Sequence, residues 1–141
     1  MKLSALNLKL FLSAILLAII TLTAQATVMS FTKNADGITC TLDKGYMKVK
    51  ICTDNIVEVK YTSLPLLLDK PSLVVTNEWK TTPGFTINES ASEIIITTAD
   101  LKVIVNKQTN SIRYTDLKEN IILSEDGSQG KTMTSATIVG I

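Results

Sequence analysis

The stretch Ile38-Thr39-Cys40-Thr41-Leu42, followed by Met47-Lys48-Val49-Lys50-Ile51 and Val57-Glu58-Val59-Lys60-Tyr61, decides the fold of this chain. In each run an apolar side chain recurs at every second position, with a polar residue between. A period of two predicts a β-strand that has one buried and one solvated face. Asp43-Lys44-Gly45 and Asp54-Asn55 supply turns between the runs. The three runs therefore predict an antiparallel meander.

The same pattern continues toward the C-terminus, with turn residues after about every eight to twelve positions. Ser63 to Pro71 contains two prolines and is expected to be a connection. Further strands are expected at Leu73–Thr76, Phe85–Ile87, Glu93–Thr98, Leu101–Val105, Ile112–Tyr114 and Ile121–Leu123. The residues expected in the core are Val49, Ile51, Val57, Val59, Leu101, Val103, Val105 and Ile112. This spacing predicts an all-β chain, an antiparallel β-sandwich with no helix longer than two turns after Ala26.

The first 26 residues have the three parts of a signal peptide. Lys2 and Lys9 supply the positive start, Leu10 to Leu22 is almost wholly apolar, and Ala24-Gln25-Ala26 matches the small-x-small cleavage pattern. The alternative is an uncleaved membrane anchor, but an apolar run of about 13 residues is short of the roughly 20 that a spanning helix needs. We expect a signal-peptide helix at 1–26, cleavage after Ala26, export to the periplasm or the exterior, and no membrane contact afterwards.

Removal of 26 of the 141 residues leaves 115, enough for one domain at 27–141. It also removes two lysines, so the formal charge falls from +1 to −1. A nearly neutral surface gives no electrostatic case for binding nucleic acid. The last residues, Thr134 to Ile141, have the pattern of a strand without a closing turn. The expectation is therefore a β-sandwich domain that is incomplete.

The two cysteines, Cys40 and Cys52, are expected to be unpaired. If residues 43–45 turn a hairpin, Cys40 lies opposite roughly Lys48, and Cys52 falls about four residues further along. At roughly 3.4 Å per residue that offset approaches 13 Å, beyond the roughly 7 Å at which two cysteines can be bridged. Cys52 also alternates with Lys48 and Lys50, on the polar side. Cys40 is therefore expected to be the more buried thiol.

The residue types that usually carry catalysis are scarce. The chain has no histidine, which removes the usual base of a serine or cysteine nucleophile and the commonest zinc ligand. The run Gly127 to Thr132 resembles the end of a phosphate loop but has Glu125 in place of the first glycine. The carboxylates fall on solvated strand faces or in turns: Glu58, Glu89, Glu93, Asp100, Asp116 and Glu119. No catalytic residue, metal ligand or cofactor site is predicted.

Trp79 is the one candidate contact residue, because it lies between two charged residues just before the turn Thr81-Thr82-Pro83-Gly84. It could anchor a loop, stack on a partner domain or contact a sugar. Tyr61, Tyr114 and Phe85 instead fit the core-facing alternation.

Beside these patterns stands a family resemblance. Gly37 to Leu42, Met47 to Ile51 and Asn55 to Tyr61 resemble the opening of glycoside hydrolase family 31. The later run is more specific: Leu101 to Val105, a polar loop from Asn106 to Ser111, Ile112 to Asp116, and Ile122-Leu123-Ser124-Glu125. Together they cover roughly Gly37 to Glu125 and are most similar to exported bacterial α-glucosidases and α-xylosidases.

The resemblance implies a galactose-mutarotase-like β-sandwich that precedes a (β/α)₈ catalytic barrel. In that family both catalytic aspartates belong to the barrel, and no position here matches their motifs. The chain is thus expected to be a non-catalytic part of an enzyme acting on α-glycosidic bonds, with the barrel as its partner. Two alternatives stay open: a free-standing carbohydrate-binding module, and an adhesin or assembly subunit that exchanges strands.

Overall fold

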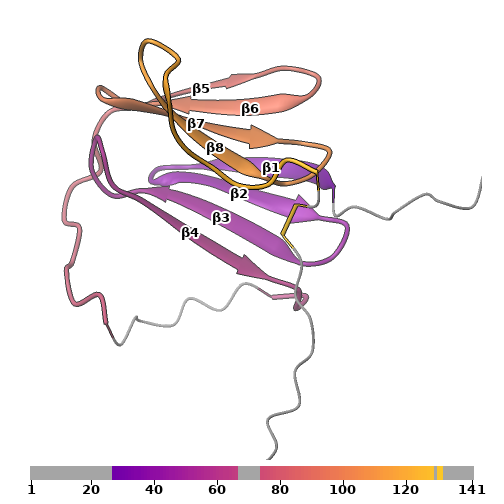
Figure 1. Cartoon of the computed structure of the whole chain (residues 1–141). Helices are drawn as coiled ribbons and strands as arrows, with labels where there is room; N and C mark the ends of the chain where they lie inside the picture. The colour runs from indigo at the N-terminus through magenta and orange to yellow at the C-terminus, as the bar shows by residue number, and fades with distance from the viewer. Residues whose placement is uncertain (1–26, 67–73, 129, 132–141) are drawn as a thin grey trace, which may run out of the picture.

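The computed structural model describes residues 27–66, 74–128 and 130–131. They form nine β-strands in two antiparallel sheets that pack face to face (Figure 1). No helix occurs in these ranges. The predicted all-β class and the antiparallel sandwich are confirmed, whereas the predicted signal peptide and the strand-like run 134–141 lie outside the described residues.

The four-stranded sheet has the order β1-β2-β3-β4, so each strand pairs with its neighbour in sequence. Its strands are β1 Val28–Asn34, β2 Gly37–Leu42, β3 Tyr46–Ile51 and β4 Val57–Thr62. The last three are the predicted meander. Cys40 lies opposite Met47 rather than Lys48, one residue from the predicted register. β1 was not predicted from the sequence.

The five-stranded sheet has the order β5-β6-β7-β8-β9 and is also a meander. Its strands are β5 Thr86–Glu89, β6 Glu93–Thr97, β7 Leu101–Asn106, β8 Ile112–Asp116 and β9 Ile121–Ser124. All five match predicted strands. The predicted strand at residues 73–76 is wrong where it can be compared, because residues 74–76 are not extended into a sheet.

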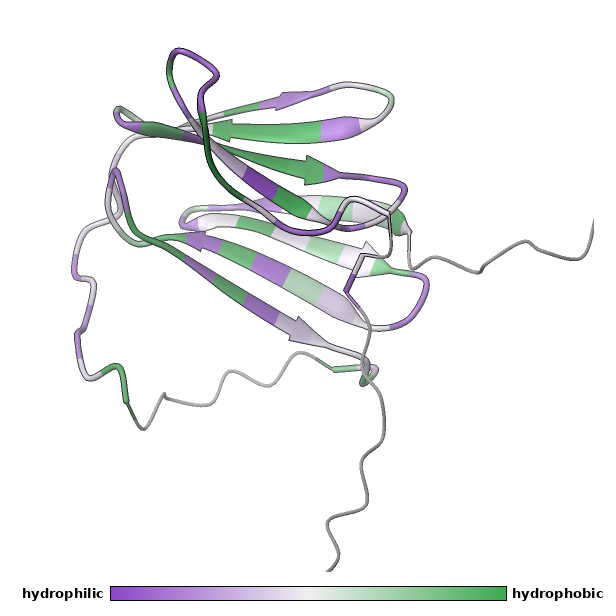
Figure 2. Cartoon of the chain, viewed as in Figure 1, coloured by the Kyte–Doolittle hydropathy of each residue, from purple (hydrophilic) through white to green (hydrophobic). Residues whose placement is uncertain are grey.

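The core lies between the two sheets and consists of the apolar set of each alternating strand. Figure 2 shows hydrophobic and hydrophilic residues alternating along β3 and β4. Six of the eight predicted core residues are buried, while Val57 and Val59 are half-buried and pack on the core from the same face of β4. The shared face of these two valines supports the predicted alternation.

Both cysteines are free and buried, Cys40 with 0% and Cys52 with 2% of its surface exposed. The predicted absence of a bridge is confirmed within this structure. Cys52 does not lie on the polar face of β3, however, because β3 ends at Ile51 and the alternation stops there. The backbone N–H of Cys52 instead donates to the Ile56 carbonyl in the turn that follows, at 2.9 Å.

Hydrogen bonds between loops fasten the sheets at their ends. The Val28 N–H donates to the Lys107 carbonyl at 2.8 Å, joining β1 to the β7–β8 turn. The Thr98 hydroxyl donates to the Asp54 carbonyl at 2.6 Å, joining the β6–β7 turn to the β3–β4 turn. These bonds join the two sheets outside the apolar core.

Candidate functional site

Trp79 lies in a segment without regular structure that leads toward β5. Its side chain is half-buried, whereas both neighbours, Glu78 and Lys80, are exposed. The other aromatic residues of the described ranges are also half-buried: Phe31, Tyr46, Tyr61, Phe85 and Tyr114. Four of these, all but Tyr46, pack on the core. No flat row of exposed aromatic rings, the usual platform for a sugar, is present in the described part.

The predicted surface carboxylates are engaged in ion pairs and turns. Four glutamates pair with cations: Glu58 with Lys60, Glu89 with Lys107, Glu93 with Arg113 and Glu119 with Lys102. Such partly exposed pairs contribute little to stability. Their geometry also differs from a glycosidase site, which needs two carboxylates across one sugar bond.

Asp116 has a structural role in the turn between β8 and β9. Its Oδ1 accepts hydrogen bonds from the backbone N–H groups of Lys118, at 2.8 Å, and Asn120, at 2.9 Å. Its Oδ2 accepts a bond from the Asn120 side chain at 2.7 Å. The bonds from Asn120 lower the pKa of the Asp116 carboxyl below its ordinary value. Asp116 therefore remains ionised as a turn acceptor.

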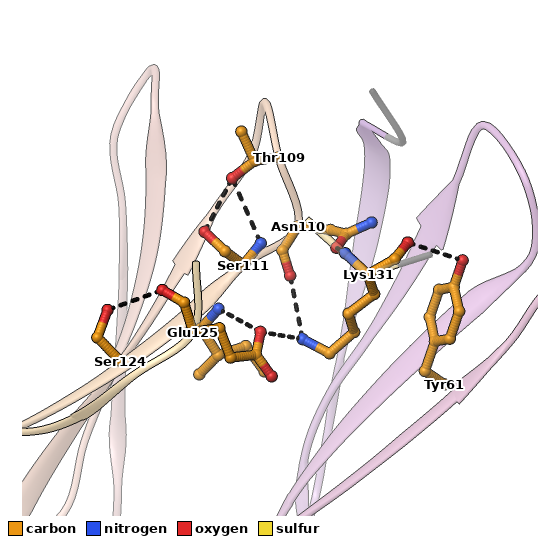
Figure 3. Close-up of polar contacts among 8 residues, drawn as sticks. Tyr61, Thr109, Asn110, Ser111, Ser124, Glu125 and Lys131 are labelled. Carbon is orange, nitrogen blue, oxygen red and sulfur yellow. Dashed lines mark hydrogen bonds and ion pairs between the residues drawn. The ribbon is translucent and has the colours of Figure 1, made fainter. Parts of the chain in front are cut away.

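The densest polar arrangement is one that the sequence did not predict. It consists of Tyr61, Asn110, Glu125 and Lys131, and we call it the inter-sheet cluster (Figure 3). The Lys131 ammonium contacts a Glu125 carboxylate oxygen at 2.5 Å and the Asn110 carbonyl at 3.3 Å. The same Glu125 oxygen accepts a bond from the backbone N–H of Ile112 at 2.9 Å. Charge-assisted bonds of this kind are stronger than neutral ones.

Backbone conformation holds the inter-sheet cluster together. Asn110 is fully buried and adopts a left-handed conformation with φ of 52°. Its side-chain oxygen accepts a bond from the Lys131 N–H at 2.7 Å. Gly130 has φ of 64°, and a Cβ at this position would lie 1.9 Å from the Thr109 carbonyl oxygen. The close approach requires glycine, because any side chain would push the two segments apart.

The inter-sheet cluster links the two sheets across the sandwich. The Tyr61 hydroxyl, on β4, donates to the Lys131 carbonyl at 3.3 Å. Burial raises the pKa of the Tyr61 phenol, and the negative charge of Asp43 adds to the shift. The tyrosine therefore stays protonated and keeps its donor. Glu125 is the only acid among the four members, so the cluster can hold the chain in place but lacks the pair of acids that glycoside hydrolysis uses.

Within the described residues, no group of three or more His, Cys, Asp or Glu side chains could hold a metal ion. The same ranges contain no apolar helix of membrane-spanning length.

β9 carries the clearest apolar surface. Ile121, Ile122 and Leu123 are 66%, 62% and 60% exposed. Leu117, in the preceding turn, is 49% exposed. β9 is also an edge strand, and within the described residues it pairs only with β8. We call these four residues the β9 surface.

Comparison with known proteins relates the fold to one enzyme family. No protein-family model matches the sequence. A dextranase of glycoside hydrolase family 31 from Flavobacterium johnsoniae, solved with glucose and, as a mutant, with isomaltotriose, superimposes with a TM-score of 0.68. The match covers 77% of this chain at 16% identity, but only 14% of the dextranase. An uncharacterized protein from Listeria monocytogenes, lmo2446, matches with a TM-score of 0.54 at 18% identity, over 73% of this chain and 10% of that one.

The chain thus shares its fold with a small part of a much longer family 31 enzyme. The family resemblance drawn from the sequence is confirmed at the level of the fold.

Proposed function

We propose that this chain is a non-catalytic β-sandwich domain of an exported family 31 glycoside hydrolase that acts on α-glycosidic bonds. The observation that carries the proposal is the agreement between the sequence resemblance and the fold comparison. Strand by strand, the sequence resembles the sandwich of that family, and the fold superimposes on a portion of a family 31 dextranase. The domain's partner is the catalytic barrel of the same enzyme.

The proposed role is mechanical: the sandwich supports the barrel and helps to shape its sugar pocket. The β9 surface supports this role, because contiguous exposed apolar residues usually mark a protein interface. β9 carries no charged residue to discourage association, and charges are the usual protection of an isolated edge strand. We assign the β9 surface to the contact with the barrel.

Catalysis is assigned to the barrel for a chemical reason. A retaining glycosidase holds two carboxyl groups roughly 5–5.5 Å apart, one acting as acid and one as nucleophile. In the sandwich the glutamates of the strand faces are paired with lysines or arginine, and Asp116 serves a turn. Neither the ion-paired glutamates nor Asp116 provides two unpaired carboxyl groups on opposite sides of a sugar bond.

The test uses the natural protein, taken from the cells that produce it. An antibody raised against residues 27–131 is expected to detect an exported polypeptide far heavier than the 15.3 kDa of this chain. That polypeptide should co-purify with activity toward aryl α-glucosides or α-xylosides, and its N-terminus should begin at Thr27. Detection only of a species no heavier than 15.3 kDa, with no associated glycosidase activity, would contradict the proposal.

Trp79 distinguishes this proposal from a free-standing carbohydrate-binding module. In our proposal Trp79 does not serve as a sugar platform, so Trp79→Ala should leave the retention of the chain on immobilised α-glucan unchanged. Lys80→Ala, at the exposed neighbouring position, is the matched control. Strong retention that is lost only in Trp79→Ala would favour the binding module instead.

A further inference from the structure

The N-terminal end of β1 is held by the turn between β2 and β3. Thr27 immediately precedes β1, and Asp43 immediately follows β2. The Asp43 N–H donates to the Thr27 carbonyl at 3.0 Å, and the Thr27 nitrogen donates to Oδ1 of Asp43 at 3.2 Å. A carboxylate oxygen therefore lies within hydrogen-bond distance of the Thr27 backbone nitrogen.

Backbone bonds on both sides fix the position of Thr27. Val28 pairs with Leu42 in the ladder of β1 and β2, and the Val28 N–H donates to the Lys107 carbonyl of the other sheet at 2.8 Å. The Thr27 carbonyl is bound by the Asp43 N–H, as described above. None of these bonds uses the Thr27 nitrogen, so they place it beside Asp43 whatever charge it carries.

The expected signal-peptide cleavage changes the charge of this nitrogen. In the unprocessed chain the Thr27 nitrogen is a neutral amide with one hydrogen. Hydrolysis of the peptide bond between Ala26 and Thr27 adds the hydroxyl of a water molecule to the Ala26 carbonyl carbon and the remaining hydrogen to the Thr27 nitrogen. The resulting amine takes up a proton at pH 7, because an α-amino group has an ordinary pKa of about 7.7–8.0. An ammonium group adds a Coulomb attraction to the carboxylate that a neutral amide lacks.

We propose that processing after Ala26 creates an ion pair between the Thr27 α-ammonium group and the Asp43 carboxylate, and that this pair fastens the N-terminal end of β1. The inference rests on the export that is part of the proposed function, but not on the glycosidase activity. Within the described residues β1 is an edge strand that pairs with β2 alone. Processing therefore strengthens an end of the sandwich that the unprocessed chain holds without this positive charge.

The ion pair also acts on the inter-sheet cluster, through Tyr61. Burial raises the pKa of the Tyr61 phenol, and the negative charge of Asp43 raises it further. A cation beside Asp43 offsets that charge. The pKa of Tyr61 should therefore be lower in the processed chain than in the unprocessed one.

Two forms of the chain separate the charge from the hydrogen bond. One form begins at Thr27 and has a free amine there. The other begins at Gln25, so the Thr27 nitrogen stays an amide and the terminal charge moves up to about 7 Å along the chain. In the form that begins at Thr27, Asp43→Asn is expected to lower the titration midpoint of the amine, followed by NMR, by about 0.5 pH unit. It should also speed amide exchange in β1 about two- to fourfold.

The controls isolate the ion pair from other effects of the substitution. In the form that begins at Gln25, Asp43→Asn should change exchange in β1 by less than about 1.5-fold, because asparagine still offers an oxygen to an amide hydrogen. Asp100→Asn, at an exposed acid in the β6–β7 turn, is the matched control and should alter neither the amine midpoint nor exchange in β1. The effect of Asp43→Asn on the amine should shrink in about 1 M salt, which screens exposed charges.

Comparison of the two unsubstituted forms keeps the inference testable if Asp43→Asn fails to fold. Exchange in β1 should be about two- to fourfold slower in the form that begins at Thr27, and Tyr61 should titrate at lower pH. Equal exchange and equal Tyr61 midpoints in the two forms, or an amine midpoint that Asp43→Asn leaves unchanged, would overturn the ion pair. These outcomes do not depend on the activity of the parent enzyme. A natural N-terminus at a residue other than Thr27 would overturn the formation of the pair by processing.

Discussion

At the scale of single residues, two buried threonines differ in whether their hydroxyl groups are hydrogen-bonded. Thr98 donates to Asp54 and accepts a bond from the Leu101 N–H at 3.0 Å. The Thr115 hydroxyl is buried and has no hydrogen-bond partner among the described residues. A buried hydroxyl without a partner costs roughly 1–3 kcal/mol.

Replacement of each threonine by valine should therefore shift stability in opposite directions. Thr115→Val is expected to raise the free energy of unfolding by about 1 kcal/mol, because it removes an unsatisfied group at nearly constant shape. Thr98→Val should lower it by about 2 kcal/mol, because Asp54 and Leu101 lose their partner. Urea unfolding of the two variants beside wild type provides the measurement. A loss of stability in Thr115→Val as large as that in Thr98→Val would show that Thr115 has a partner.

The Cys40 thiol should make stability depend on alkaline pH. Burial raises its pKa from 9.0 to about 11 in the folded state. Below pH 9 the thiol is protonated in both states, and its contribution to stability is fully present. Between pH 9 and about 11 the unfolded chain releases the proton first, so the free energy of unfolding falls, by roughly 2 kcal/mol.

Cys40→Ala isolates this effect from that of the tyrosines. Burial also raises the pKa of Tyr61 and Tyr114, but both remain in the variant. The stability gap between wild type and Cys40→Ala should therefore narrow as pH rises from 9 to about 11, in urea unfolding at each pH. A gap that stays constant over this range would mean that the thiol ionises equally in both states.

At the scale of elements, Gly37 allows β2 to begin close against β3. Its φ is 143°, and a Cβ there would lie 2.0 Å from the Val49 carbonyl oxygen. Gly37→Ala should therefore lower the free energy of unfolding by more than about 2 kcal/mol. Gly84→Ala, where a Cβ would meet nothing within 4 Å, is the matched control and should change stability by less than about 0.5 kcal/mol. Equal thermal unfolding midpoints for Gly37→Ala and Gly84→Ala would argue against backbone strain at position 37.

The sequence predicted eight of the nine strands, because their apolar residues alternate regularly. β1 was missed for a physical reason: its register shifts between Val28 and Ser30, where a bulge disturbs the pairing. Its half-buried apolar residues, Val28 and Phe31, are three positions apart rather than two. The strand expected at 73–76 is not formed over residues 74–76, which shows the converse error: β-branched residues favour a strand, but the preference depends on tertiary context.

The inter-sheet cluster could not be predicted from pattern. Tyr61 and Lys131 are 70 positions apart, and their bond uses a backbone carbonyl, which every residue possesses. Asn110 was assigned to a hairpin loop correctly, but its burial and its bond to Lys131 depend on how the sheets stack. Gly130-Lys131 lies in the run compared with a phosphate loop, and the signal for its role is a glycine beside a cation after the last strand.

At the scale of the whole molecule, the use of polar groups agrees with the supporting role proposed above. Two meanders of four and five strands enclose one apolar core, and their polar groups are used in turns, ion pairs and the inter-sheet cluster. The dextranase that shares this fold is about seven times longer than the part that matches, since the match covers 14% of it. In the proposed function the sandwich contributes surfaces to a larger enzyme, and the β9 surface is the candidate for that contact.

The purified chain should accordingly show no hydrolysis of aryl α-glucosides or α-xylosides above a buffer blank. Such catalysis needs an acid and a carboxylate held on either side of the scissile bond, roughly 5–5.5 Å apart in a retaining enzyme. The glutamates of the strand faces lie beside cations instead, and Glu125 is bound by Lys131 and the Ile112 N–H. Release of the aryl group, followed over hours at high protein concentration, is the measurement. Turnover that survives purification and disappears in Glu125→Gln, or in a variant of any other single acid, would place a catalytic site in the sandwich itself.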